Sequence, residues 1–200
     1  MLDTKHMNHF TEEQIERVIE ETVAAQKAYR QGTNRPLEGI HLAVKDNIDV
    51  FGFRTTGGSA ALKGHKSKRD SSLWQMLRQQ GAICLGKTNM HEMAHGTSSL
   101  NETYGYVLNP RDSQRIASGS SGGSASAVGA GVAMASLGTD TGGSIRIPAA
   151  FCGVYGYRPT VNRWPADFGL KCSHIRDSVG PITNNINDII LLDSLISDET

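Results

Sequence analysis

Two histidines and a glutamate in one short stretch are the first residues in this sequence whose types and spacing could do chemistry. The stretch HEMAH places His91 and His95 four positions apart, with Glu92 between them. On a helix, residues four apart share a face, so the two imidazoles could bind one zinc ion while the carboxylate acts as a general base. This pattern raises the hypothesis of a zinc hydrolase.

The residues around this stretch argue against a zinc site. Gly96 follows His95 directly, and the TSS sequence after it ends any helical periodicity. The extended zinc-protease pattern has a third histidine at the position of Asn101. We therefore expect a short helix of barely two turns, no bound metal and a structural role beside the real site, where Met90 and His91 would at most line the pocket.

A second group of polar residues lies in the segment 118–160, which is rich in glycine and serine. Such a composition is also typical of a flexible linker. From Ala125 to Leu137, however, the residues are mostly small and apolar, and Asp140 and Arg146 are the segment's only charges before its final GYRPT. Paired glycines precede hydroxyl residues, where backbone N–H groups can bind an anion. The segment is therefore predicted to be a packed helix and strand that carry an oxyanion site.

Hydrophobic periodicity predicts the elements that position these residues. Thr11 and Gln14 form a capping-box pattern ahead of a helix that Gly32 ends. The apolar residues of this helix recur at helical spacing: Ile15, Val18, Ile19 and Val23. A last helix covers 186–196, with Asn185 or Asn187 as its cap.

Between these helices, the pattern alternates strand, helix and strand. Residues 40–45 alternate with period two and end in Lys45, a helix runs from Asp70 as N-cap to Gly81, and 82–86 read as a buried strand. This order predicts a parallel α/β sheet.

Composition limits the kinds of partner. The chain of 200 residues suits one domain or one lobe of a larger protein, and its 20 basic and 20 acidic residues are scattered. We therefore expect no nucleic-acid or membrane partner. The first residues form no apolar signal segment, and the cysteines Cys84, Cys152 and Cys172 are odd in number and widely spaced. A cytoplasmic protein with reduced thiols is therefore expected.

Three stretches, AVKDN, SGSSGGSASA and GTDTGGSIRIPAAFCG, resemble the amidase signature family, the serine hydrolases that use a Ser, cis-Ser, Lys triad. The resemblance runs from about Leu37 to the end of the chain. It implies an α/β fold with a mixed, mostly parallel sheet flanked by helices. Matched residue by residue, it implies Ser144 as nucleophile, Ser120 as the bridging serine after a cis peptide bond, and Lys45 as base. One departure is Ser118, which stands where the family usually has glycine.

The implied triad makes chemical demands. Lys45 accepts a proton only when neutral, so its pKa must fall by roughly 3 units, which costs about 4 to 5 kcal/mol that burial can impose. The N–H groups of Thr141, Gly142 and Gly143 would stabilise the oxyanion.

Three neighbouring side chains are expected to support the site without taking part in the reaction. Ser121 either assists by hydrogen bonding or caps the next helix, and capping is favoured. Asp140 and Arg146 are expected to shape the loop, with Arg146 as a partner behind the reacting groups.

Shorter matches bear on the substrate. NMHE, GYRPT and IRDSVGPI are similar to indoleacetamide and mandelamide hydrolases, which favours a small primary carboxamide cleaved to carboxylate and ammonia without a cofactor. The A subunit of glutamyl-tRNA amidotransferase is the alternative, and a homodimer is left open. Because family members are about twice as long, residues 1–200 would be the N-terminal part of the domain, and an inactive fragment is a further alternative.

Overall fold

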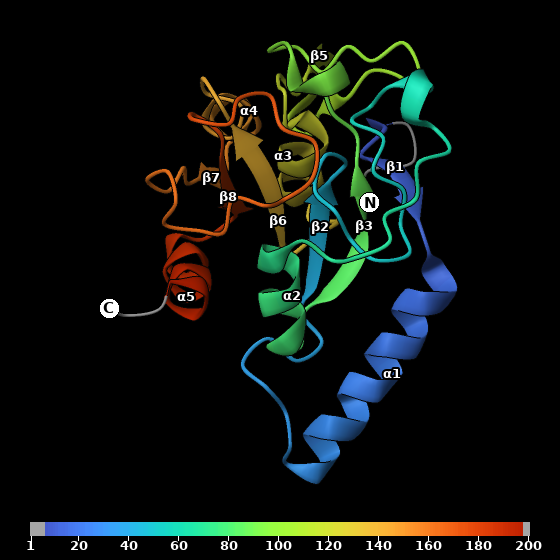
Figure 1. The fold of residues 1–200 in the computed structure, drawn as a ribbon, viewed down its shortest axis with the longest axis vertical. Coiled ribbons are helices and arrows are strands. Elements are labelled where there is room, and N and C mark those ends of the chain that lie inside the picture. Colours follow the sequence, from blue (N-terminus) through green and yellow to red (C-terminus); the bar gives the residue numbers. More distant parts are fainter. Residues whose placement is uncertain (1–6, 198–200) are drawn as a thin grey trace.

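A computed structural model describes residues 7–197, which form a six-stranded sheet with helices on both faces (Figure 1). The strand order is β1-β3-β2-β6-β8-β7. The three central strands, β3, β2 and β6, are parallel, and the outer pairings are antiparallel. The bounds are β1 Phe10–Glu13, β2 His41–Lys45, β3 Ile83–Thr88, β6 Ala135–Asp140, β7 Tyr155–Gly156 and β8 Ser178–Thr183. The α/β prediction with a mixed sheet is confirmed.

Between Phe10 and Ile196, the remaining elements are five α-helices, the 3-10 helices η2 and η3 and a hairpin. The helices are α1 Ile15–Gln31, α2 Ser72–Gln79, α3 Gly122–Gly129, α4 Arg146–Cys152 and α5 Ile186–Ile196, with the 3-10 turns η2 Ala60–Leu62 and η3 Glu92–Ala94. The hairpin pairs β4 Leu108–Asn109 with β5 Asp112–Ile116. Within residues 7–197, none of the helices combines the length and apolar character needed to span a membrane.

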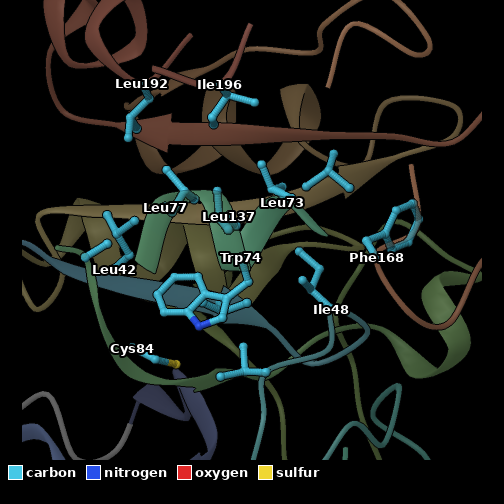
Figure 2. Close-up of a cluster of buried hydrophobic side chains, with 14 of the residues drawn as sticks. Leu42, Ile48, Leu73, Trp74, Leu77, Cys84, Leu137, Phe168, Leu192 and Ile196 are labelled. Carbon is cyan, nitrogen blue, oxygen red and sulfur yellow. The ribbon is translucent and has the colours of Figure 1, made fainter. Parts of the chain in front are cut away.

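The two faces of the sheet carry separate cores, because side chains alternate along each strand. Leu42 and Val44 of β2 pack with α2 and α5, whose Trp74 and Leu192 are seen among the labelled side chains of Figure 2. Ala43 packs on the other face, against the alanines of α3 and α4. The small residues of 118–160 therefore let α3 and α4 approach the sheet closely, and the segment is not a linker.

The start of the chain differs from the prediction. Thr11 lies in β1, where its hydroxyl donates to the Lys87 carbonyl, and the N-cap of α1 is Gln14, whose side chain makes no capping bond. The capping-box prediction is wrong because Thr11 belongs to β1, while the Gln14 amide donates to Glu12 Oε1 and the Gly52 carbonyl. Helix α1 ends at the predicted place, where Gly32 adopts a left-handed conformation with φ of 68°.

The apolar stripe of α1 also lies elsewhere than periodicity suggests. Ile15, Ile19 and Val23 are between 57% and 61% exposed, and Ala25 is the buried residue of this helix. Periodicity correctly predicts the helix but cannot show which of its faces contacts the sheet.

The caps of two later helices are now defined. Ser71, not Asp70, caps α2, because its Oγ accepts from the Trp74 N–H, while Asp70 accepts from the Phe51 N–H. Asn185 caps α5 by accepting from the N–H of Asn187.

Candidate active site

Lys45 is the last residue of the central strand β2 and lies between two other strand ends. Its side chain has no solvent exposure. The Nζ atom lies 2.8 Å from Ser120 Oγ and 2.8 Å from Thr139 Oγ1, and the Thr139 carbonyl is 3.4 Å away. The sheet thus brings a lysine and a serine that are 75 residues apart into direct contact.

The surroundings of Lys45 alter its ionisation. Burial lowers the pKa of Lys45 from its usual 10.5 to about 7, and the negative charges of Asp140 and Asp177 oppose that shift only in part. A buried ammonium loses its hydration, so the neutral amine is favoured. At neutral pH a large share of Lys45 is therefore able to accept a proton.

Ser120 lies in the turn that leads into α3. The peptide bond between Gly119 and Ser120 is cis, and the Ser120 side chain is fully buried. Ser118, the departure from the family pattern, has a φ of 67°, in the left-handed region that favours glycine. Its hydroxyl donates to the Thr97 carbonyl, which helps to hold this conformation.

Ser144 lies in the loop between β6 and α4 and is partly exposed. The N–H of Ser121 donates to the Ser144 carbonyl at 3.1 Å, which fixes this loop beside the Ser120 turn. The structure therefore brings all three residues of the implied triad to the carboxyl end of the central strands.

Asp140 organises the loop that carries Ser144. Its carboxylate accepts from the N–H groups of Gly143 at 2.7 Å and Ile145 at 3.1 Å, and it pairs with Arg146 at 3.0 Å and with Arg158 at 3.4 Å. Burial alone would raise the pKa of Asp140, but the hydrogen bonds from Arg146 and the two N–H groups outweigh it and lower the pKa. A carboxylate so held shapes the loop, as expected for Asp140 and Arg146.

Gly143 departs from its expected place in the oxyanion site. Its N–H is engaged by Asp140, so in this structure that donor is not free for a substrate oxygen. Thr141 and Gly142 are left as the expected donors, and the Thr141 hydroxyl donates to Asp177 Oδ1 at 2.5 Å.

Ser121 does not cap α3 with its side chain, so the favoured prediction is wrong. Its Oγ donates to the Thr139 carbonyl at 3.2 Å and accepts from the Thr139 N–H at 3.4 Å. The hydroxyl ties the Ser120 turn to β6, which is the other role considered for it.

Several polar residues near Lys45 escape prediction from the sequence. Thr139 Oγ1 accepts from both Lys45 Nζ and Asn47 Nδ2, while Asp177 and Arg158 hold the loops on the far side. Asn47 directly follows AVKD, Asp177 lies in IRDSVGPI and Arg158 lies in GYRPT. Membership of these three motifs is the signal that could have found them.

The HEMAH stretch forms no zinc-protease helix. Only Glu92–Ala94 are helical, in the 3-10 turn η3, and Met93 has a φ of 51°. His91 Nδ1 lies 3.2 Å from Ser98 Oγ, whereas His95 Nδ1 lies 3.6 Å from Cys172 Sγ, so the two imidazoles have different partners. In the described part of the chain, no three residues among His, Cys, Asp and Glu are grouped to hold a metal ion.

The two residues expected to line the pocket differ in exposure. Met90 is fully buried, as Lys45 and Ser120 are, and its place beside a substrate stays a prediction. His91 is partly exposed, and its N–H donates to the Ser120 carbonyl at 3.1 Å, so it borders the site.

Comparison with known proteins identifies the family of this chain. The family model described as Amidase matches residues 3–200. The chain belongs to the amidase family. Among amidase structures, the native peptide amidase from Stenotrophomonas maltophilia superposes with a TM-score of 0.88 at 34% identity, over 97% of this chain and 41% of the other.

Curated relatives of this amidase chain include proteins with different names. The A subunit of a glutamyl-tRNA(Gln) amidotransferase from Nitratiruptor sp. is 47% identical over 80% of this chain, and an indoleacetamide hydrolase from Pseudomonas savastanoi is 46% identical over 81%. A mandelamide hydrolase from Pseudomonas putida is 48% identical over 83%. The chain spans 34% to 36% of the length of these three relatives.

Proposed function

We propose that this chain carries the catalytic centre of an amide hydrolase in which Ser144 is the nucleophile, Ser120 relays the proton and Lys45 is the base. The observation that supports it most directly is the 2.8 Å contact between Lys45 Nζ and Ser120 Oγ, at a place where burial brings the pKa of Lys45 to about 7. A general base is most effective when its pKa lies near the working pH.

The proposed reaction has two halves. As Ser144 attacks the amide carbon, its proton passes to Ser120 and the proton of Ser120 passes to Lys45. The N–H groups of Thr141 and Gly142 stabilise the oxyanion. When the C–N bond breaks, Lys45 returns the proton through Ser120 to the leaving nitrogen. Water then attacks the seryl ester by the same route and releases the carboxylate.

The proposed substrate is a small primary carboxamide of the arylacetamide or mandelamide type. Similarity to the indoleacetamide and mandelamide hydrolases supports it. The second candidate is a glutamine-hydrolysing component of an amidotransferase, which the 47% identity to the Nitratiruptor protein supports equally well. In either case, residues 1–200 would be the N-terminal, catalytic part of an amidase domain.

Ammonia release from a panel of amides tests this proposal. Indoleacetamide, mandelamide, glutamine and a fatty amide are each incubated with the protein and with Ser144→Ala. Loss of the nucleophile should reduce turnover by about 10⁴-fold or more. A chelator should leave turnover unchanged, because no step uses a metal.

The same panel separates the alternatives. Turnover that survives in Ser144→Ala would refute the nucleophile assignment. Preference for glutamine together with recovery in a stable complex would favour the amidotransferase component. Absence of turnover on every amide, with a folded protein, would favour an inactive fragment.

A further inference from the structure

A thiol and an imidazole that take no part in the proposed hydrolysis lie side by side at the candidate active site. Cys172 Sγ is 3.6 Å from His95 Nδ1, within hydrogen-bonding distance for sulfur. Cys172 is partly exposed and His95 is exposed, so reagents in solution can reach both. His95 is also the second histidine of HEMAH, for which the amidase chemistry has no use.

The segment that carries Cys172 is tied to the site at two points. The N–H of Leu170 donates to the Asn47 carbonyl at 2.9 Å, and Asn47 lies two residues after Lys45. The N–H of Cys172 itself donates to Asp177 Oδ2 at 2.8 Å, and the other oxygen of Asp177 accepts from the Thr141 hydroxyl. Cys172 is therefore held between the segment of the base and the segment of the oxyanion donors.

His95 belongs to a different segment of the chain, which contacts Ser120. His95 is the C-cap of η3. His91 is the N-cap of the same turn, and its backbone N–H donates to the Ser120 carbonyl. The contact between Cys172 and His95 thus joins the segment beside Ser120 to the segment beside Thr141. A group attached to the sulfur would therefore lie next to both segments.

The other two thiols differ from Cys172 in access and in chemistry. Cys84 and Cys152 are buried, and burial raises the pKa of each thiol to about 12. Since the thiolate is the reactive form, neither competes for an electrophile at neutral pH.

We propose that Cys172 and His95 form a thiol-modification site that takes low-molecular-weight disulfides and, once modified, closes the entrance to Ser144. With the ring proton on Nε2, His95 Nδ1 accepts the proton of the Cys172 thiol. The thiolate attacks one sulfur of the disulfide, the disulfide bond breaks and a new bond joins Cys172 to that sulfur. The other half leaves as a thiolate and takes the proton from the imidazolium, so the cysteine is oxidised and the departing thiol is reduced.

Adduct mapping tests the site itself, independently of any hydrolysis. The protein is treated with oxidised glutathione at pH 7.5, and the adduct is located by intact and peptide mass spectrometry. One glutathione on Cys172 is expected, formed roughly tenfold more slowly or worse in His95→Asn, which keeps an acceptor but has no basic nitrogen. His174→Asn is the matched control, since it removes a nearby exposed imidazole that makes no such contact, and it should leave the rate unchanged. An adduct on Cys84 or Cys152, or an equal rate in His95→Asn, would overturn the proposal.

Closure of the entrance rests on the proposed function and is measured by ammonia release. The glutathione adduct should lose more than about 90% of turnover and regain it with dithiothreitol. The adduct of bis(2-hydroxyethyl) disulfide should lose less, because a smaller attached group blocks less of the access to the site. Cys172→Ser and Cys172→Ala should be active and insensitive to both reagents. Full turnover by the glutathione adduct would refute closure. An untreated protein that releases no ammonia contradicts the proposed function alone, and the adduct map still decides the modification site.

Discussion

Lys45 is the residue on which the candidate chemistry depends, because its charge decides whether Ser120 has a proton acceptor. Full burial brings its pKa to about 7 while Ser120 and Thr139 remain within 2.8 Å. The same burial that keeps the amine neutral, and so able to act at neutral pH, also makes its charged form costly to keep in the fold. Activity and stability should therefore both depend on pH through this one group.

Turnover should follow the deprotonation of Lys45. We expect kcat/KM to rise about tenfold per pH unit below pH 7 and to level off above it, since only the neutral amine accepts a proton. The measurement is a pH–rate profile of ammonia release from pH 5 to 9. A profile that is flat across pH 7, or that falls there, would contradict Lys45 as the base.

Lys45 should make the free energy of unfolding depend on pH with the opposite sign to a lysine in an ordinary ion pair. Between pH 7 and 10.5 the unfolded chain holds a proton on Lys45 that the folded chain has lost, so the free energy of unfolding rises with pH in that window. Below pH 7 the full penalty, roughly 5 kcal/mol for such a shift, is present. Lys45→Met should be inactive and, at pH 7, more stable than the unchanged protein. Its free energy of unfolding should not rise with pH in this window. Urea unfolding at pH 6, 8 and 9.5 measures both effects on stability.

Thr139 offers a finer test of the site. Thr139→Val removes the hydroxyl that accepts from Lys45 Nζ and Asn47 Nδ2. An acceptor stabilises the ammonium, so its loss should lower the pKa of Lys45 further and move the pH–rate profile to lower pH. One N–H of the Asn47 amide would lose its acceptor, while the other still donates to the Leu170 carbonyl, and the lost bond should cost about 1 to 3 kcal/mol of stability. Thr139→Ser, which keeps the hydroxyl, should leave the profile in place, and a profile unmoved by valine would contradict the assignment.

At the scale of elements, the sequence predicts strands and helices well and their partners less well. Period-two alternation in β2 and the capped pattern of α5 are local signals, so both can be found close to their observed bounds. The contact of Thr139 with Lys45 depends on the parallel register of β2 with β6, which pairs Val44 with Leu137 across a long separation. No local pattern encodes that register, so the contacts around Lys45 could not be predicted, although motif membership points to some of the residues that make them.

Helix α1 shows the same limit. Its stripe of Ile15, Ile19 and Val23 is a sound sign of a helix, but which face meets the sheet depends on where β1 leaves the sheet. In Figure 1 the helix runs from the end of β1 toward the bottom of the view, and midway along it Thr22 Oγ1 lies 2.8 Å from His41 Nε2 of β2.

Substitutions in α1 should therefore have effects opposite to those its hydrophobicity suggests. Ile19→Gln removes an exposed side chain and should change the free energy of unfolding by no more than about 0.5 kcal/mol. Ala25→Leu places extra volume where Ala25 is 3% exposed and packs close to Gly39, and should cost about 1 to 3 kcal/mol. Urea denaturation of both variants checks this order. A larger loss for Ile19→Gln would mean that α1 lies against the body through its other face.

At the scale of the whole molecule, apolar side chains are exposed on α5 and at the residue that precedes β6. Ile186, Ile190 and Leu191 are between 45% and 61% exposed, and Met134 beside them is 57% exposed. Leu191 and Met134 line one hollow with Leu37 and Ile40. Contiguous apolar surface of this kind promotes association in water.

This surface should make the isolated chain associate with itself. We expect the sedimentation coefficient to rise with protein concentration, and Ile190→Lys to reduce that rise by placing a charge on the patch. Ile175→Lys is the matched control, because Ile175 is 81% exposed on a loop that lacks these neighbours, and it adds the same charge. Equal effects of the two variants would show that net charge, not the patch, governs association.

The position of Lys45 at the end of a central strand also sets when the protein can become reactive during its synthesis. A lysine in an unfolded chain has its ordinary pKa of 10.5 and is a cation at neutral pH, with no capacity to deprotonate a serine. Its partners Ser120 and Thr139 lie 75 and 94 residues further along the chain. A nascent polypeptide on the ribosome therefore holds no neutral lysine beside Ser120 until β6 has been translated and has paired with β2. Folding itself is the event that creates the proposed base, so a misfolded or incomplete copy carries no activated serine.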